Sequence, residues 1–309
     1  SLSKLGLIAA PPSVEKRPRT AVPSRSASRS ASSRPATAGA KLTPKTPKSV
    51  SKVAVPQEAD SFLPNDNKAE RARKAPKRSL AKPLIEDIQR PENLRNLQNT
   101  LSQYVTKNLC GYLFHADFKK HCTAVEIMSS LVSDAESFQG VVDNLDLVFQ
   151  WFSYRVCEGN MQVLVKILDL IGVLTAKLKA QGYKMSDYEA NMIIPCLVEK
   201  CGHNNDRIRQ TYKDLLAKLA QVYNSKAAIL MILKGMYSKN YRTKLVCLEA
   251  LDNLHQQNES DFHTSKVIKE IAILVSERDI VVKNTALALM ANIYSNIGSQ
   301  LWKYLSSIP

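Results

Sequence analysis

From about residue 91 onward, hydrophobic positions recur with a helical spacing, and the alternation typical of β-strands is absent. Between residues 208 and 223, large apolar residues lie on one face of a helix: Ile208, Tyr212, Leu215, Leu216, Leu219 and Tyr223. Residues 161–178 are apolar nearly all round, so we expect that helix to lie between two others. The pattern predicts an all-α fold.

A short polar turn precedes the second helix of each of five predicted helix pairs. Each turn holds an Asp or Asn where a helix N-cap is expected: Asp117, Asn160, Asp206, Asn240 and Asp279. These positions are 34 to 46 residues apart, and a period of about 40 with two helices per unit is typical of HEAT and armadillo repeats. Because one helix pair cannot bury its apolar face alone, we expect the pairs to stack into an α-solenoid.

Charge and proline divide the chain into two parts. Residues 1–83 carry 18 Lys/Arg and 5 Asp/Glu, a net +13, and 11 of the 14 prolines. Residues 84–309 carry 25 Lys/Arg and 23 Asp/Glu, a net +2, and hold every Tyr, Trp and Cys. We therefore predict a disordered basic linker over 1–83 and a folded domain over 84–309. Because the chain begins with serine, we expect it to be a piece of a longer protein.

The cysteines and histidines do not form a recognisable site. Cys196 and Cys201 are five positions apart, no second pair accompanies them, and zinc needs about four converging ligands. We therefore predict no metal and no cofactor, and we interpret the Cys201-Gly202-His203 stretch as part of a turn. Glycine-rich phosphate loops, GxSxG and HExxH are absent, so no enzyme is predicted. No apolar run approaches the roughly 18 residues of a membrane helix.

Basic residues in the turns call for an explanation beyond capping. A cation in the first turn of a helix opposes the helix dipole by about 0.3–1 kcal/mol, yet four of the five turns carry one. Stacking would align these turns as a basic ridge along one edge. For Arg209 and Lys283 two roles are equally possible. They either contact an acidic partner or form a structural ladder, in which they pair with cap aspartates of neighbouring repeats. For Lys119, Lys239 and Arg242 we favour contact with an acidic partner.

Phe118 directly follows a predicted cap, where a polar residue is expected. It is either a hydrophobic staple that packs into its own repeat or an exposed anchor for a partner.

Several segments resemble successive repeats of a TOG domain from the Dis/TOG family of microtubule-associated polymerases. They include "LFHADFKKHCTAVEIM", "LVEKCGHNNDRIR" and "YSKNYRTKLVCLEAL", and the resemblance runs from about Lys82 to Pro309. "FHADFKKH" is similar to a later domain of the family's array. The resemblance implies a paddle of about six HEAT repeats whose turns bind αβ-tubulin and microtubules without catalysis. It also implies a cytoplasmic, cytoskeletal location at spindle poles, centrosomes and plus ends, with acidic coiled-coil centrosomal proteins as further partners of the parent chain.

By position, the resemblance implies which residues contact tubulin. In the first and second turns they are Phe118, Lys119 and Asn160, and Phe118 stands where early TOG domains have tryptophan. In the fourth and fifth turns they are Lys239, Asn240 and Lys283. We add Asn205, Arg207 and Arg242, from the third and fourth turns, as candidate tubulin contacts. The chain departs from the family pattern at Asn205, often a lysine, and at Tyr241, often a proline. The preference for free or polymerised tubulin stays open.

An alternative function rests on the basic tail. The stretch "SRSASRSASS" suits a helical-repeat adapter that binds RNA or ribonucleoprotein through counterion release. Against it, the folded part lacks a concentrated basic face with interleaved aromatic residues, so we expect no specific nucleic-acid site. The absence of heptads favours a monomer.

Overall fold

The computed structural model describes residues 59–75 and 90–306 of the 309-residue chain. These residues belong to one compact unit that runs from Pro56 to Pro309. Most of the predicted basic linker, residues 1–58 and 76–83, lies outside the described residues, so its predicted disorder stays a prediction.

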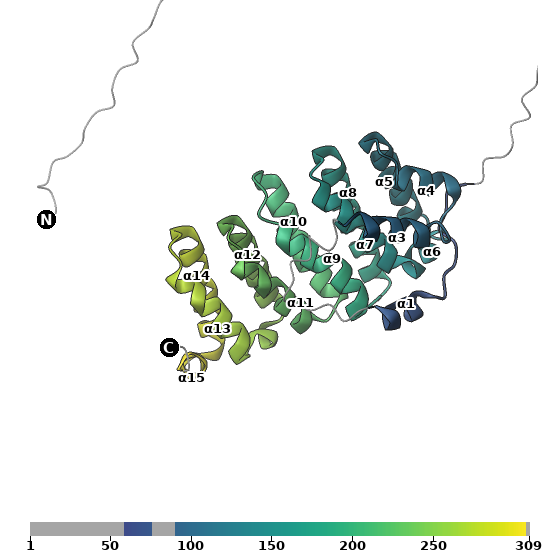
Figure 1. The fold of residues 1–309 in the computed structure, drawn as a ribbon. Coiled ribbons are helices and arrows are strands. Elements are labelled where there is room, and N and C mark those ends of the chain that lie inside the picture. Colours follow the sequence, from purple (N-terminus) through teal and green to yellow (C-terminus); the bar gives the residue numbers. More distant parts are fainter. Residues whose placement is uncertain (1–58, 76–89, 307–309) are drawn as a thin grey trace, which may run out of the picture. The chain divides into compact units, whose positions relative to one another are not determined.

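Two helices precede five described helix pairs, and a single short helix follows them (Figure 1). The first helices of the pairs are α4 (Lys107–Leu113), α6 with α7 (Phe138–Asp143, Leu145–Glu158), α9 (Asp187–Lys200), α11 with η1 (Ser225–Ile232, Leu233–Tyr237) and α13 with η3 (Ser265–Ile273, Leu274–Ser276). The second helices are α5 (Phe118–Ser133), α8 (Met161–Ala180), α10 (Asp206–Val222), α12 (Tyr241–Gln257) and α14 (Ile280–Ile297). The remaining elements are α1 (Lys68–Lys74), α3 (Pro91–Leu101), η2 (Glu259–Phe262) and α15 (Gln300–Leu305).

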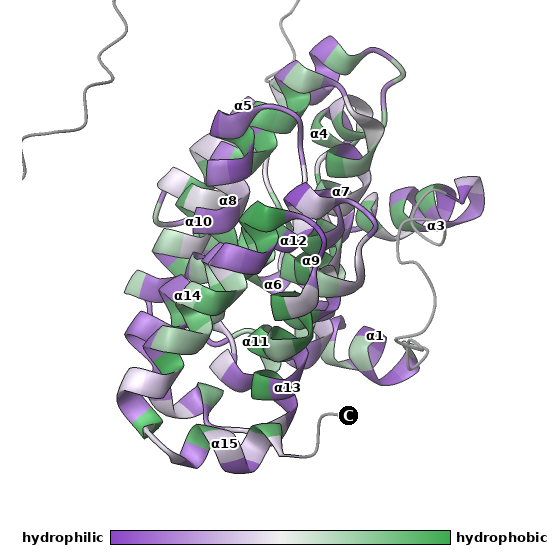
Figure 2. Ribbon diagram, turned by 90° about the vertical axis from the view of Figure 1, so that its left-hand side faces the viewer, coloured by the Kyte–Doolittle hydropathy of each residue, from purple (hydrophilic) through white to green (hydrophobic). Residues whose placement is uncertain are grey.

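The two sets of helices stack as two layers, which confirms the predicted α-solenoid. The second helices α5, α8, α10, α12 and α14 pack side by side in chain order, and the first helices line the other layer (Figure 1). As predicted, α8 lies between two other second helices, α5 and α10, although Val165 and Val173 on its outer face stay exposed. Figure 2 shows long hydrophobic stretches on α9 and α11 within the stack. Helix α7 is buried on all sides, with Trp151, Phe149 and Phe152 fully enclosed.

Side-chain caps start every second helix. Asp117, Asn160, Asn240 and Asp279 accept hydrogen bonds from backbone N–H groups in the first turn, as predicted. The third cap was predicted one residue too late: Asn205, not Asp206, has the extended conformation and accepts from the backbone N–H groups of the next turn. Residues 204–207 read Asn-Asn-Asp-Arg, and either an amide or a carboxylate side chain can cap a helix. The extended backbone conformation of Asn205 makes that residue the cap.

The folded unit begins earlier than the predicted boundary at residue 84. Residues 59–75, which we call the strap, pack against the first three helix pairs. Phe62 is 7% exposed, forms an isolated antiparallel bridge with Val105, and leads by way of a short loop into α1. The composition of residues 1–83 did not indicate this segment, because Phe62 is the only aromatic residue between positions 1 and 83.

Neighbouring repeats approach closely at Gly202, in the turn between α9 and α10. A Cβ atom there would lie 2.8 Å from the backbone nitrogen of Thr243 and 2.5 Å from Asn240 Nδ2, both in the next repeat. The Asn240 amide also donates to the Gly202 carbonyl at 2.9 Å. Gly202 is therefore required for the contact between these two turns.

We predict that Gly202→Ala lowers the free energy of unfolding by about 1–3 kcal/mol, because the added methyl group forces two turns apart. Urea unfolding followed by circular dichroism measures the change. Gly111→Ala is the matched control: Gly111 is helical with open space around it, so alanine there should raise stability by about 0.5–1 kcal/mol. Equal effects at the two sites would contradict the close approach.

The strap also gives the domain a pH dependence. Burial alone would raise the pKa of the Glu189 carboxyl, but hydrogen bonds from Tyr183, Lys68 and the Ser186 backbone outweigh burial and hold it below its usual 4.5. A carboxyl whose pKa is lower in the folded state adds stability above its unfolded pKa, and that stability is lost as the pH falls through the folded pKa. We predict that Glu189→Gln lowers stability at pH 7 by more than about 1 kcal/mol and flattens its acid limb below about pH 4.5. Chemical unfolding at several pH values tests this, with exposed Glu92→Gln as the control.

Candidate protein-binding edge

The five turns between first and second helices lie along one edge of the domain. We call this the turn edge and define it as residues 114–120, 159–162, 201–207, 238–242 and 277–283. In Figure 1 it follows the upper ends of α5, α8, α10, α12 and α14, whereas α1 lies at the opposite ends of the first helices. Stacking thus brings together residues that are up to 169 positions apart in the sequence.

The backbone of three turns is held by the residue two positions before the cap. His115 Nδ1 accepts from the Asp117 N–H at 2.9 Å, and His203 Nδ1 accepts from the Asn205 N–H at 3.0 Å. The Ser238 hydroxyl accepts from the Asn240 N–H at 3.2 Å in the same way. His203 therefore shapes a turn, as its position in the sequence suggested.

The thiol next to His203 is buried. Cys201 Sγ lies 4.0 Å from Cys247 Sγ, and Cys157 and Cys196 form a second close pair at 3.5 Å. None of the six cysteines forms a disulfide. Hydrogen bonding to the neighbouring thiol, together with burial, raises the pKa of the Cys196 and Cys247 thiols. Within the described residues, no group of three or more His, Cys, Asp or Glu is placed to hold a metal ion.

Arg209 is a structural residue of its own turn. Its guanidinium donates to the carbonyl oxygens of His203 at 2.6 Å and Asn204 at 3.0 Å, and it forms an ion pair with Asp206. In the first turn, His121 occupies the equivalent position, and its Nε2 contacts the His115 carbonyl at 2.6 Å. The structure thus departs from the predicted ladder, because Arg209 pairs within its repeat rather than with a neighbouring cap.

Ion pairs between repeats are made by other lysines. Lys166 pairs with Glu126 at 2.6 Å, Lys213 pairs with Glu249 at 3.3 Å, and Lys244 pairs with Glu277. Hydrogen bonding to Lys244 lowers the pKa of the Glu277 carboxyl. These lysines connect successive repeats, so a ladder of ion pairs exists, but it is made by Lys166, Lys213 and Lys244.

Several other basic residues of the turn edge point to solvent. Lys119, Arg207, Lys239 and Lys283 are exposed, and among the residues that the structure describes they form no ion pair. Arg242 is half-exposed, with its guanidinium 4.9 Å from the centre of the Tyr241 ring. Their charges are available to a partner.

The predicted asparagines have defined roles in the turns. The side-chain oxygens of Asn160, Asn205 and Asn240 cap their helices, so each is committed to the backbone. Phe118 is half-buried and packs against the hydrophobic core, as the staple alternative predicted, with part of its ring left at the surface. Whether these residues also touch a partner stays a prediction.

Sequence reasoning missed exposed apolar residues on the same edge. Met161, Tyr241 and Ile280 are the first helical residues after their caps, with 42%, 41% and 70% of their surface exposed. Val281, the next residue, is 49% exposed. The signal was present in the sequence, because four of the five caps are followed directly by a large apolar residue. The edge is therefore apolar as well as basic.

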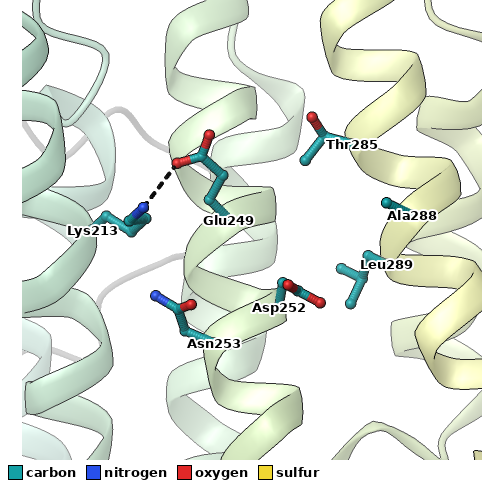
Figure 3. A pocket seen from close by; sticks show the side chains of 7 residues that line it. All are labelled: Lys213, Glu249, Asp252, Asn253, Thr285, Ala288 and Leu289. Atoms are coloured by element: carbon teal, nitrogen blue, oxygen red, sulfur yellow. Dashed lines mark ion pairs between the residues drawn. The ribbon is translucent and has the colours of Figure 1, made fainter.

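Two cavities lie away from the turn edge. One of about 170 Å³ lies between α10, α12 and α14 and is lined by Lys213, Glu249, Asp252, Asn253, Thr285, Ala288 and Leu289 (Figure 3). Another, of about 430 Å³, lies between α8 and α10. Neither contains a predicted contact residue, so the candidate site is an open surface. In the described residues, no helix combines the length and apolar character needed to cross a bilayer.

A solenoid of HEAT-type helix pairs with an exposed apolar and basic turn edge is a protein-binding module. The family described as XMAP215/Dis1/CLASP, TOG domain, matches residues 113–308. The chain therefore belongs to this TOG-domain family, and the resemblance found in the sequence is confirmed.

Relatives and solved structures agree with this assignment. The chain is 29% identical to protein MOR1 of Arabidopsis thaliana over 84% of its own length, and 27% identical to protein mini spindles of Drosophila melanogaster over 66%. It spans only 13% and 10% of those proteins. A TOG domain of Zyg9 from C. elegans matches with a TM-score of 0.69 and 25% identity, covering 79% of this chain and 91% of that one. A structure from work on TOG–tubulin binding specificity matches with a TM-score of 0.67 and 27% identity, covering 76% and 93%.

Arg209 and Lys283 each occupy the fourth position of a second helix, yet only Arg209 holds a turn. We predict that Arg209→Met lowers the free energy of unfolding by about 1–3 kcal/mol, because it removes a charged donor from two turn carbonyls, one of them partly buried. Lys283→Met should change it by less than about 0.5 kcal/mol. Thermal and urea unfolding of the two variants measures both changes. A larger loss of stability for Lys283→Met than for Arg209→Met would refute the structural role of Arg209.

Proposed function

We propose that this domain binds αβ-tubulin through its turn edge and takes part in microtubule assembly by binding alone, without catalysis. The observation that carries the proposal is the alignment of unpaired cations and exposed apolar residues on one edge of a TOG-family solenoid. The proposed contact residues are Phe118, Lys119, Asn160, Asn205, Arg207, Lys239, Asn240, Arg242 and Lys283.

The edge has two complementary means of binding. Lys119, Arg207 and Lys239 lie on separate turns, so their charges form a row that can steer an acidic partner and speed encounter. Met161, Tyr241 and Ile280 add apolar surface that loses water on contact. A row of charges sets the orientation of the partner, and the apolar contacts slow its release.

The relatives support a cytoskeletal role. Solved TOG domains that match the chain come from work on tubulin binding and recruitment, and mini spindles and a Dictyostelium discoideum centrosomal protein are among its relatives. We place the parent protein at spindle and centrosomal microtubules, including their plus ends. There the basic linker would support attachment to the lattice, and acidic coiled-coil centrosomal proteins are further candidate partners. The domain itself acts as a monomer in this proposal.

The RNA alternative receives no support from the fold or the relatives. The exposed cations of the turn edge are spread over successive turns, and the edge carries no row of stacked aromatic rings of the kind that single-stranded nucleic acids use. Basic residues of the linker lie mostly outside the described residues, so nonspecific attraction to polyanions through that segment is a separate property.

The decisive test compares two triple variants with the same change in net charge. Lys119→Ala, Lys239→Ala and Lys283→Ala remove cations from the turn edge. Lys107→Ala, Lys266→Ala and Lys303→Ala remove exposed cations from α4, α13 and α15. We predict that the edge variant weakens binding to tubulin by about tenfold or more, because it loses steering and three contacts to acidic groups. The control variant should bind like the unmodified chain.

Binding is measured by size exclusion with unpolymerised tubulin and by sedimentation with stabilised microtubules, each at two salt concentrations. The two assays also decide between free and polymerised tubulin as the preferred partner. Equal losses in both variants would mean that only total charge matters. No binding of the unmodified chain in either assay at low salt would refute the proposed function.

A further inference from the structure

The strap follows the edge of the domain that lies opposite the turn edge. It contacts residues in or just before the first turns of α4, α7 and α9, which are the first helices of three successive repeats. The turns lie at the other ends of these helices. In Figure 1, α1 accordingly lies at the lower ends of the first helices, away from the turn edge.

On the first repeat, the strap is held by backbone pairing. The Leu63 N–H donates to the Tyr104 carbonyl at 2.8 Å, and the Thr106 N–H donates to the Ser61 carbonyl at 3.2 Å. The Asp60 carboxylate accepts from the Thr106 hydroxyl at 3.0 Å. These bonds fix the register of Phe62, whose side chain is buried.

On the second repeat, the strap fits against a glycine and an asparagine. A Cβ atom on Gly140 would lie 2.8 Å from the Phe62 carbonyl oxygen, so only glycine allows this approach. The buried Asn144 side chain accepts from Asn65 at 2.6 Å and donates to the Leu63 carbonyl at 3.0 Å. Because Asn144 also precedes the first residue of α7, the strap is tied directly to the start of that helix.

Two cations of the strap neutralise two buried carboxylates. Arg71 forms a two-point ion pair with Asp146 of α7 at 2.7 and 2.8 Å, and the Asp146 side chain is 1% exposed. Lys68 contacts Glu189 of α9 at 2.9 Å, and the Glu189 side chain is also 1% exposed. A buried carboxylate without its cation is strongly unfavourable, so these pairs hold the strap in place.

The Lys68 ammonium also joins two repeats. It donates to the Val142 carbonyl of the second repeat at 2.9 Å and to the Tyr183 hydroxyl, before the third, at 3.0 Å. One side chain therefore fixes the start of α7 relative to the start of α9. Both helices have 14 residues, so the turns lie roughly 21 Å further along.

We propose that the strap sets the spacing of the first three turns from the opposite edge of the domain, with Lys68 and Arg71 as positioning residues for the turn edge. The orientation of repeats in a solenoid depends on small rotations between neighbours. Joining the starts of α4, α7 and α9 limits those rotations, and the far ends of the helices move with them. The expected effect of the strap on tubulin binding rests on the proposed function. Its expected effect on the distances between the turns does not.

The first experiment measures distances between turns by electron spin resonance. Spin labels on an unnatural ketone side chain are placed at Ala116 and Asn204, in the first and third turns. A second pair at Lys239 and Arg278, in the fourth and fifth turns, lies on repeats that the strap does not contact. The full chain is compared with Lys68→Met/Arg71→Met and with Lys74→Met, which removes an exposed cation of the same helix.

We expect the double variant to broaden or shift the distance between the first and third turns and to leave the distance between the fourth and fifth turns unchanged. Lys74→Met should change neither distance. Because the double variant removes the cations of two buried carboxylates, Gly140→Ala serves as a second variant that displaces the strap and keeps both cations. Unchanged first-to-third distances in both variants, with helical content preserved, would overturn the proposal. If the double variant unfolds, Gly140→Ala decides the outcome alone.

The second experiment measures tubulin binding by the same unlabelled variants. We expect Lys68→Met/Arg71→Met to weaken binding by about tenfold although neither residue lies on the turn edge, and Lys74→Met to have no effect. A synthetic peptide of residues 59–75 should partly restore binding to the variant. If the unmodified chain does not bind tubulin, the proposed function fails while the distances still decide the role of the strap. If distances change and affinity does not, the strap sets spacing without affecting binding, and the positioning role is refuted.

Discussion

The stacking of helix pairs is the interaction on which the rest of this structure depends. No pair can enclose its own apolar faces, so each first helix is buried by its neighbours, and α7 and α9 are enclosed almost completely. That burial takes in charged groups as well as apolar ones. Arg155 of α7 is 3% exposed and donates to the Leu113 carbonyl, and Asp146 and Glu189 need cations from a distant segment. The depth of the stack thus explains why two buried carboxylates are paired with cations of the strap.

Stacking also divides each turn into an inner and an outer set of side chains. The inner set closes the turn: caps such as Asn205, the histidines and Ser238 before the caps, and Arg209 over the turn carbonyls. The outer set includes Lys119, Met161 and Ile280, whose side chains do not close the turn. Charge that opposes the helix dipole remains in the outer set, which is the expected result if it serves a partner rather than the fold.

Local pattern was sufficient for the fold class and four of the five caps, because each depends on residues within one helical turn of each other. The repeat period followed from the recurrence of those local patterns along the chain. It was insufficient where two neighbouring side chains compete for one role, as at Asn205 and Asp206. It failed for the strap, since Lys68 acts on Glu189, 121 positions away. The partners of Arg209 and Lys244 could not be predicted either, because helical spacing allows each to reach its own turn or the next repeat. The exposure of Tyr241 and Ile280 could have been inferred from the sequence. A residue directly after a cap is the first of its helix and therefore lies at the edge of the stack, where fewer neighbours cover it.

The inner and outer sets have different freedom to change. Because the backbone of each turn is closed by hydrogen bonds to buried or cap side chains, replacing an outer residue alters the surface without altering the path of the chain. Each of the five turns presents one outer residue at the same position, the first residue of its second helix. These residues are Phe118, Met161, Asp206, Tyr241 and Ile280. Descendants of one ancestral solenoid can therefore diverge in what they recognise one turn at a time, while inheriting the same scaffold.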